Sequence, residues 1–253
     1  MGNKSKLAPI IISHMKPHDV YAEPFFGAGG LYFNKPIAKH NFLNDLDDDV
    51  YNLWQCYFYR KAELLEAVKV TPLSMSVFKH FMKCTPKDEI EKALRFLYLS
   101  NFSLYGKMIT FRIGTHNCKE VLIKNFHSQH STESVKFTCI DFRKFFSSVE
   151  WNKKDDDNRI MVYCDPPYAG TADNYSHSFT ERDTIDLLDI LHKTQKHYKN
   201  FYYMVSEFKS DFILYEAGKR GLHVTEVGER QSLKSRNTEI ILTNYRTEKG
   251  LFD

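Results

Sequence analysis

The sequence predicts an α/β fold built on a parallel sheet, with a mainly helical insertion in its middle. Short apolar runs that suit strands alternate with stretches of helical periodicity toward both ends of the chain. Such alternation is typical of parallel sheets with right-handed crossovers. Between residues 46 and 135 the alternation breaks down and helical spacing dominates. We therefore predict one sheet domain, formed by residues 1–45 and 136–253, that carries an inserted subdomain, residues 46–135.

The expected strands are short and end in polar or glycine-rich turns. They span residues 19–26, 41–44, 136–140, 160–164 and 201–206, followed by two antiparallel strands at 222–227 and 239–244. Helices are expected at residues 29–35, 185–191 and 211–217, and inside the insertion at 50–58 and 90–98. Turns around residues 108–112 predict one short strand of a hairpin in the insertion.

Composition sets only broad bounds. A net charge of +3 permits a local basic face but does not by itself indicate a nucleic-acid binder. The five cysteines show no C-x-x-C spacing, which favours reduced thiols, and His116, His127 and His130 fit no zinc pattern, so no metal is expected. No stretch approaches the ~18 apolar residues of a membrane span, and the start lacks the apolar core of a signal peptide. The sequence thus predicts a soluble, cytoplasmic protein.

A glycine-rich turn follows the first expected strand, in the string Glu23-Pro24-Phe25-Phe26-Gly27-Ala28-Gly29-Gly30. Glycines there let the backbone turn sharply and approach a ligand without a Cβ in the way. The spacing is not the G-x-G-x-x-G of dinucleotide binders. Asp45 ends the next expected strand, where a carboxylate can accept both hydroxyls of a ribose. Turn and acid together favour a nucleoside cofactor over the alternative, a tight structural turn with a helix-starting Asp45.

The most informative string is Val162-Tyr163-Cys164-Asp165-Pro166-Pro167-Tyr168, in which an apolar strand runs directly into two prolines. The prolines fix φ and remove two donors, which leaves carbonyl acceptors in a stiff turn. Ligands bind at this carboxyl edge of such sheets. An amino group bonded to these acceptors and to Asp165 has its lone pair aimed at an incoming electrophile, and a flipped base can stack on Tyr168. The string suits methyl transfer to an exocyclic amino group; the alternative is a strand-ending turn with a helix-capping Asp165.

In this order, the two strings resemble those of the Dam-like DNA adenine methyltransferases, the D12 class. The resemblance extends to residues 2–7, similar to the family's G-x-K segment, to Asn44-Asp45, to Asp141-Phe142, to Tyr175 with Phe179, and to residues 238–245, similar to its closing strand. It implies a Rossmann-like sheet that binds S-adenosylmethionine, with a target-recognition subdomain as the insertion. The cofactor-binding residues that it implies are Lys4, Glu23, Phe25, Gly27, Gly29, Asp45, Asp141, Phe142 and Asp165, and the catalytic residues are Asp165, Pro166, Pro167 and Tyr168.

Basic residues in two regions are candidates for DNA contact. Arg230, Lys234 and Arg236 lie in a polar stretch before the last expected strand, and Lys107 and Arg112 lie on the expected hairpin. Contact with DNA and a merely solvated surface are equally open for them. Residues 101–107 only loosely match the family segment that reads GATC, so the target site need not be GATC.

The function that the resemblance implies is transfer of a methyl group from S-adenosylmethionine to the exocyclic amino group of a flipped adenine, giving N6-methyladenine in double-stranded DNA. A cognate restriction endonuclease and a monomeric or weakly dimeric state are compatible with it. Two alternatives remain: an RNA base amino-methyltransferase, and a non-catalytic DNA-binding subunit that keeps the fold. Labelled methyl transfer to DNA or RNA discriminates among them.

Overall fold

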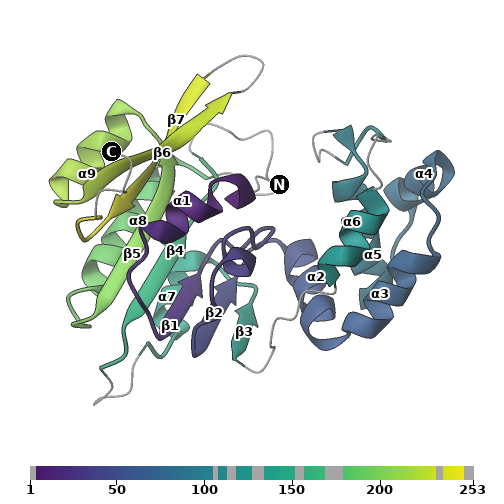
Figure 1. Cartoon of the computed structure of the whole chain (residues 1–253), viewed down its shortest axis with the longest axis horizontal. Helices are drawn as coiled ribbons and strands as arrows, with labels where there is room; N and C mark the ends of the chain where they lie inside the picture. Colours follow the sequence, from purple (N-terminus) through teal and green to yellow (C-terminus); the bar gives the residue numbers. More distant parts are fainter. Residues whose placement is uncertain are drawn as a thin grey trace. The chain divides into compact units, whose positions relative to one another are not determined.

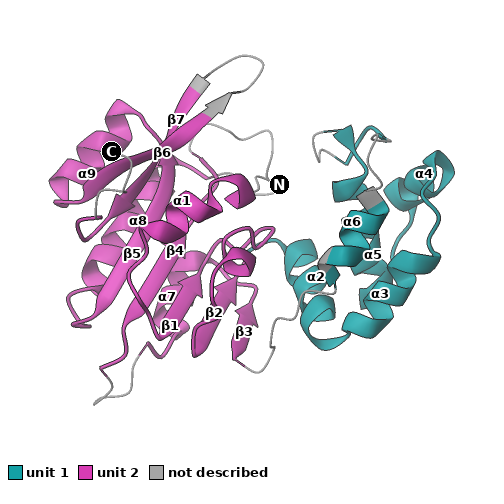
Figure 2. Cartoon of the chain, in the orientation of Figure 1, with its two compact units in different colours: residues 1, 46–133 teal, residues 2–45, 134–253 magenta. Residues whose placement is uncertain are grey.

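The chain folds into two compact units. The computed structural model describes residues 4–104, 108–112, 118–126, 134–151, 157–168, 179–231 and 236–247. One unit, here the helical unit, spans Leu46–Glu133; the other, the sheet unit, combines Gly2–Asp45 with Ser134–Asp253 (Figure 2). Among the described residues, no helix combines the length and the apolar character needed to cross a membrane.

The sheet unit contains one seven-stranded sheet with the order β3-β2-β1-β4-β5-β7-β6 (Figure 1). Its strands are β1 (Val20–Glu23), β2 (His40–Asn44), β3 (Val135–Thr138), β4 (Ile160–Cys164), β5 (Phe201–Phe208), β6 (His223–Gln231) and β7 (Arg236–Thr243). The first five strands in this order pair in parallel, whereas β7 pairs antiparallel with both β5 and β6. The parallel sheet and the two final antiparallel strands are as the sequence predicts.

Helices cover the sheet, and the described ones are α1 (Ala8–Ser13), α7 (Phe142–Ser148), α8 (Glu181–Thr194) and α9 (Asp211–Lys219). Apolar side chains of α7, α8 and α9 join alternate residues of β1, β4, β5 and β7 in one buried core. Strand β4 is buried at all five positions, as its unbroken apolar run predicts for a central parallel strand. This burial fixes the position of the end of β4 and of residues 165–168, which follow it directly.

The helical unit contains α2 (Asp48–Tyr59), α3 (Lys61–Val70), α4 (Met75–Lys83), α5 (Glu89–Asn101) and α6 (Cys118–Phe126). Side chains of Asp47, Ser74 and Asp88 cap the first turns of α2, α4 and α5 by accepting backbone N–H bonds, which satisfies donors that a helix start leaves unpaired. Aromatic side chains pack together in this unit: the rings of Phe78, Phe81 and Phe102 all contact the ring of Tyr98.

Two predicted elements are wrong. In place of a helix over residues 29–35, only a 3-10 turn forms, η2 (Tyr32–Asn34), because the glycines before it adopt positive φ and Pro36 follows it closely, which disfavours helical backbone before it. In place of a strand over residues 108–112, a single bridge joins Ser103 and Phe111. Met108 lies there at φ 57, a left-handed conformation that cannot continue a strand.

Candidate active site

The strand order brings the two informative strings to one edge of the sheet. From β1 the order runs through β2 to β3 on one side and through β4 to β5 on the other. At such a reversal the carboxyl ends of the two central strands open a crevice. Strand β1 ends at Glu23, directly before the glycine turn, and β4 ends at Cys164, directly before Asp165. The topology therefore unites the glycine turn with the Asp165–Tyr168 string.

Three buried side chains and one half-buried side chain, that of Asp165, form a group that we call the charge cluster: Lys4, Asp165, Tyr168 and Glu239. The ammonium of Lys4 lies 3.0 Å from a carboxylate oxygen of Asp165 and also contacts the Glu239 carboxylate and the Tyr168 hydroxyl. That hydroxyl donates to Glu239 and lies 3.5 Å from Asp165. Lys4 is 8% exposed and Glu239 is 2% exposed. The N-terminal segment, the end of β4 and strand β7 thus meet through paired charges.

Burial and neighbouring charges set the protonation of two members of the charge cluster, Lys4 and Tyr168. Burial alone would lower the pKa of Lys4, but the carboxylates of Asp165 and Glu239 outweigh burial and raise it. Burial, followed by the same two acids, raises the pKa of the Tyr168 hydroxyl. Lys4 is therefore an ammonium ion and Tyr168 a neutral hydroxyl that donates a hydrogen bond.

Glu239 was expected only as part of the closing strand, residues 238–245, with no role of its own. Its Cα partner across the β5–β7 ladder is Phe208, so the two side chains point to the same face. The ring of Phe208 packs against Tyr168 with centroids 4.1 Å apart, while Glu239 accepts from the Tyr168 hydroxyl. An acid directly before the apolar run of residues 240–242 is the signal that could have indicated it, because a carboxylate that such a strand buries is rarely unpaired.

The glycine turn adopts the conformation that only glycine tolerates well. Gly27 and Gly29 have φ values of 50° and 64°, in the left-handed region. A Cβ on Gly29 would lie 2.6 Å from the ring of Phe33, whereas a Cβ on Gly27 would meet nothing within 4 Å. Asp45 joins the turn, since its carboxylate accepts the backbone N–H of Gly27 at 2.7 Å. Gly29 is thus packed against neighbouring rings, whereas the space next to the Cα of Gly27 is empty.

Asn44, beside Asp45, ties the strand ends together. Its amide nitrogen donates to the carbonyl oxygens of Pro24 (3.0 Å) and Ile140 (2.9 Å), and its amide oxygen accepts from the Thr138 hydroxyl (2.7 Å) and the Ile140 N–H (3.1 Å). One buried side chain therefore bridges the ends of β1, β2 and β3 with four hydrogen bonds. This places the glycine turn, Asp45 and Asp141 along one edge.

Aromatic rings line the next part of this edge. Phe25, Phe142 and Phe179 contact one another with centroids 5.5 to 6.0 Å apart; Phe142 is buried, and the other two are half-buried. The Asp141 carboxylate is turned to its own helix, where it accepts the Arg143 N–H at 2.8 Å and pairs with the Arg143 guanidinium at 3.2 Å. The three rings therefore give this part of the edge an apolar surface. The Asp141 carboxylate is paired with Arg143 instead.

Two further carboxyl groups are buried near the site, Glu23 and Glu207. Burial raises the pKa of each to about 8, and in both cases the nearby Asp165 charge adds to the effect. Glu23 accepts the Tyr21 hydroxyl at 2.8 Å, whereas Oε1 of Glu207 has no hydrogen-bond partner among the described atoms. Lys35, which lies 4.0 Å above the Tyr21 ring, has its pKa lowered to about 8 by burial.

The candidates for DNA contact belong to both units. Arg112 lies exposed in the helical unit, where its backbone N–H donates to Phe102 O at 2.8 Å. Arg230 and Arg236 lie on paired strands, in register with Asn237 and Gln231, but their side chains lie outside what the structure describes. Lys107, Lys234 and Tyr175 are also outside the described residues.

Comparison with known proteins gives one consistent result. Residues 1–229 match the model of the D12 class N6 adenine-specific DNA methyltransferase family. Relatives include the DNA adenine methylases of Vibrio cholerae (24% identical; 77% of this chain, 75% of the relative), Escherichia coli K12 (24%; 75% and 72%) and Haemophilus influenzae (29%; 58% and 54%).

Solved structures superpose over most of the chain, but only loosely. The N-terminal domain of human METTL16 is 10% identical, with a TM-score of 0.41, over 95% of this chain and 68% of that one. The tRNA (m1A58) methyltransferase TrmI of Aquifex aeolicus is also 10% identical, with a TM-score of 0.41, over 98% and 71%.

The substitution Glu23→Gln is expected to flatten the pH dependence of folding stability. Glu23 ionises near pH 4.5 when unfolded but only near pH 8 when folded. Between these values the unfolded chain binds fewer protons, so stability falls as pH rises, by up to about 1.4 kcal/mol per pH unit for such a carboxyl. Urea unfolding at several pH values measures the slope. Glu66→Gln, at an exposed site on α3, should keep the wild-type slope; an equally steep slope for Glu23→Gln would contradict the assignment.

Proposed function

Because the chain belongs to the D12 class N6 adenine-specific DNA methyltransferase family, we propose that it methylates the exocyclic amino group of adenine in double-stranded DNA, with S-adenosylmethionine as the methyl donor. The observation that carries this function is the meeting of the glycine turn and the Asp165–Tyr168 string at one edge of the sheet. A cofactor and a base can lie side by side only where both strings meet.

The residues at this edge fit S-adenosylmethionine. The open space in front of Gly27 admits a ligand against the backbone, and Asp45, fixed by the Gly27 N–H, is the acceptor for the ribose hydroxyls. Half-buried Phe25 and Phe179 offer apolar ring surface for the adenine moiety. When bound, the cofactor supplies an electrophilic methyl group on a sulfonium ion. Asp141 contributes to this site through the placement of Phe142, since its carboxylate is paired with Arg143.

Asp165 is the residue that we assign to the target amino group. Its carboxylate, and the backbone carbonyls of the proline turn, accept the two amino hydrogens and leave the nitrogen lone pair directed at the methyl group. Transfer would form the nitrogen–carbon bond as the methyl carbon–sulfur bond of the donor breaks and leaves a neutral thioether. The amino nitrogen then loses one proton, for which Asp165 is the adjacent acceptor. Lys4 holds the Asp165 carboxylate in place from 3.0 Å. Lys4 thereby acts on the catalytic string, in addition to any contact with the cofactor.

Tyr168 needs a rearrangement before a base can stack on it. Only 7% of the residue is exposed, because Phe208 packs against the ring and the Lys4 ammonium lies 4.8 Å from its centroid. A flipped adenine reaches the ring once one of these contacts opens. We infer that entry of the base displaces Lys4 from Tyr168 while the Glu239 carboxylate keeps the hydroxyl in place.

The helical unit is the part that we assign to target recognition. The sheet unit contains both strings and the whole charge cluster, so reading neighbouring bases falls to side chains elsewhere. Exposed Arg112 follows the Ser103–Phe111 bridge, and an arginine that projects from a short turn can donate two hydrogen bonds to guanine in the major groove.

The substitution Asp165→Ala tests the function directly. It should lower methyl transfer to duplex DNA by on the order of a hundredfold or more, because a preorganised acceptor is lost, while circular dichroism stays unchanged. Wild-type protein should transfer labelled methyl from S-adenosylmethionine to DNA, and nucleoside analysis should find N6-methyladenine. Asp157→Ala, at an exposed site of the same unit, serves as the control.

Methylation of RNA alone, or of neither nucleic acid, would overturn the proposed function. An Asp165→Ala variant that keeps its activity would overturn only the role assigned to Asp165.

The substitution Arg112→Ala should relax one position of the methylated site. Loss of a base-reading arginine costs about 1–3 kcal/mol at that position, whereas loss of a phosphate contact weakens all sites alike. Methylome sequencing of DNA treated with each variant measures the site and its stringency. Arg182→Ala, on exposed Arg182 of α8, should leave both unchanged. An unaltered motif for Arg112→Ala would exclude base reading by Arg112.

A further inference from the structure

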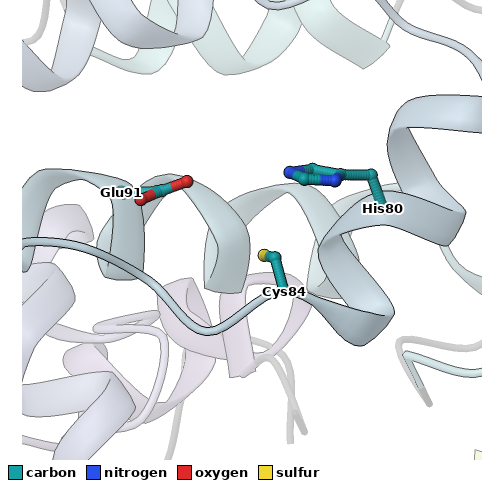
Figure 3. Close-up of side chains that lie close together, drawn as sticks. All are labelled: His80, Cys84 and Glu91. Carbon is teal, nitrogen blue, oxygen red and sulfur yellow. The ribbon is translucent and has the colours of Figure 1, made fainter.

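Three side chains with metal-binding donors converge in the helical unit. They are His80 on α4, Cys84 directly after α4, and Glu91 in the first turn of α5. One donor atom from each lies within 4.8 Å of the other two. Figure 3 shows the three side chains directed toward a common space. His80 is exposed and the other two are half-buried, so an ion can reach the donors from solvent.

The fold, rather than chance side-chain placement, brings the donors together. His80 and Cys84 are four residues apart, and the Cys84 N–H donates to the His80 carbonyl at 2.8 Å, which places both on one face of the helix. Two contacts hold α5 against α4 and its entry: Arg95 donates to Phe81 O at 2.7 Å, and the Tyr98 hydroxyl accepts the Ser74 N–H at 2.8 Å. The distance between the two helices is therefore fixed without a metal.

Glu91 is also held in place. One of its carboxylate oxygens accepts the Lys87 N–H at 2.7 Å. Outer hydrogen bonds of this kind orient carboxylate ligands in metal sites. A carboxylate oxygen of Glu91 lies within 4.8 Å of the donor atoms of His80 and Cys84. Preorganisation of this kind lowers the cost of assembling a site when an ion binds.

From this geometry we propose that His80, Cys84 and Glu91 bind one zinc ion, with water as the fourth ligand. The donors are an imidazole nitrogen, a thiolate and a carboxylate oxygen, the set that zinc prefers, whereas magnesium and calcium select oxygen ligands alone. A thiolate and a carboxylate together balance the charge of a divalent ion. Tetrahedral zinc needs its ligand atoms roughly 3.3–3.8 Å apart, so small side-chain rotations close the site from the observed spacing.

Zinc titration of the full-length protein under reducing conditions, against a chromophoric competing chelator, tests this site. Wild type should bind one equivalent of zinc, with native mass spectrometry as the check on stoichiometry. Cys84→Ser and His80→Ala should each weaken binding by at least about 10–100-fold, the loss that follows removal of even an outer-sphere partner. Cobalt substitution adds a direct readout, because a thiolate–cobalt charge-transfer band should appear in wild type and be absent from Cys84→Ser.

Matched controls separate this site from adventitious binding. Cys139→Ser removes a half-buried cysteine, and His197→Ala an exposed histidine, both in the sheet unit, and both variants should bind zinc as wild type does. Because the His80 side chain is exposed, His80→Ala should fold normally and keep the test interpretable if Cys84→Ser is unstable. Absence of zinc binding by wild type, or equal affinity in His80→Ala and wild type, would overturn the proposal.

Discussion

The charge cluster around Lys4 is the interaction on which the arrangement of the active-site edge depends. Lys4, Asp165 and Glu239 come from the first residues of the described chain, the end of β4 and the middle of β7. A charge removed from water is tolerated when its partners remain, and loss of one partner typically costs about 3–5 kcal/mol. The cluster therefore requires three distant segments to be in place at once. It joins the antiparallel end of the sheet to the Asp165–Tyr168 string in the parallel part.

A second, neutral network completes the other half of the edge. Asn44 bridges the ends of three strands through uncharged hydrogen bonds, and Asp45 adds the bond to Gly27. In the proposed mechanism, amide and backbone groups organise the cofactor side of the edge, whereas ions organise the base side. Such a division suits the chemistry, because a positively charged sulfonium centre and an amino group that must keep its lone pair require different surroundings.

Much of this could be predicted from local sequence. Strand β4 has the bounds expected for it, since its apolar run is bounded by Arg159 and Asp165 and is buried throughout. The positive φ values of Gly27 and Gly29 agree with the sharp turn that the glycines predict. These features depend on neighbouring residues, which periodicity and turn chemistry describe well.

The features that could not be predicted depend on contacts between distant residues. Glu239 faces Tyr168 only because β7 inserts antiparallel beside β5, with Phe208 as its register partner. Lys4 could be assigned to the cofactor by resemblance, but its contacts with two acids follow from tertiary packing alone. The missing helix after Gly30 and the missing strand near Met108 show the opposite case, in which unusual local backbone overrides an apolar pattern.

A double-mutant cycle on the charge cluster tests the central claim, that Lys4 and Glu239 act as one unit in positioning Asp165. Single-turnover methyl transfer would be measured for Lys4→Ala, Glu239→Gln and the double variant, with cofactor affinity and thermal stability recorded alongside. If the two residues act through the same contacts, their effects are not additive. The account predicts that the double variant is about as slow as the slower single variant, with cofactor affinity retained in Glu239→Gln. Rate losses that simply multiply, or a Glu239→Gln variant as fast as wild type, would contradict it.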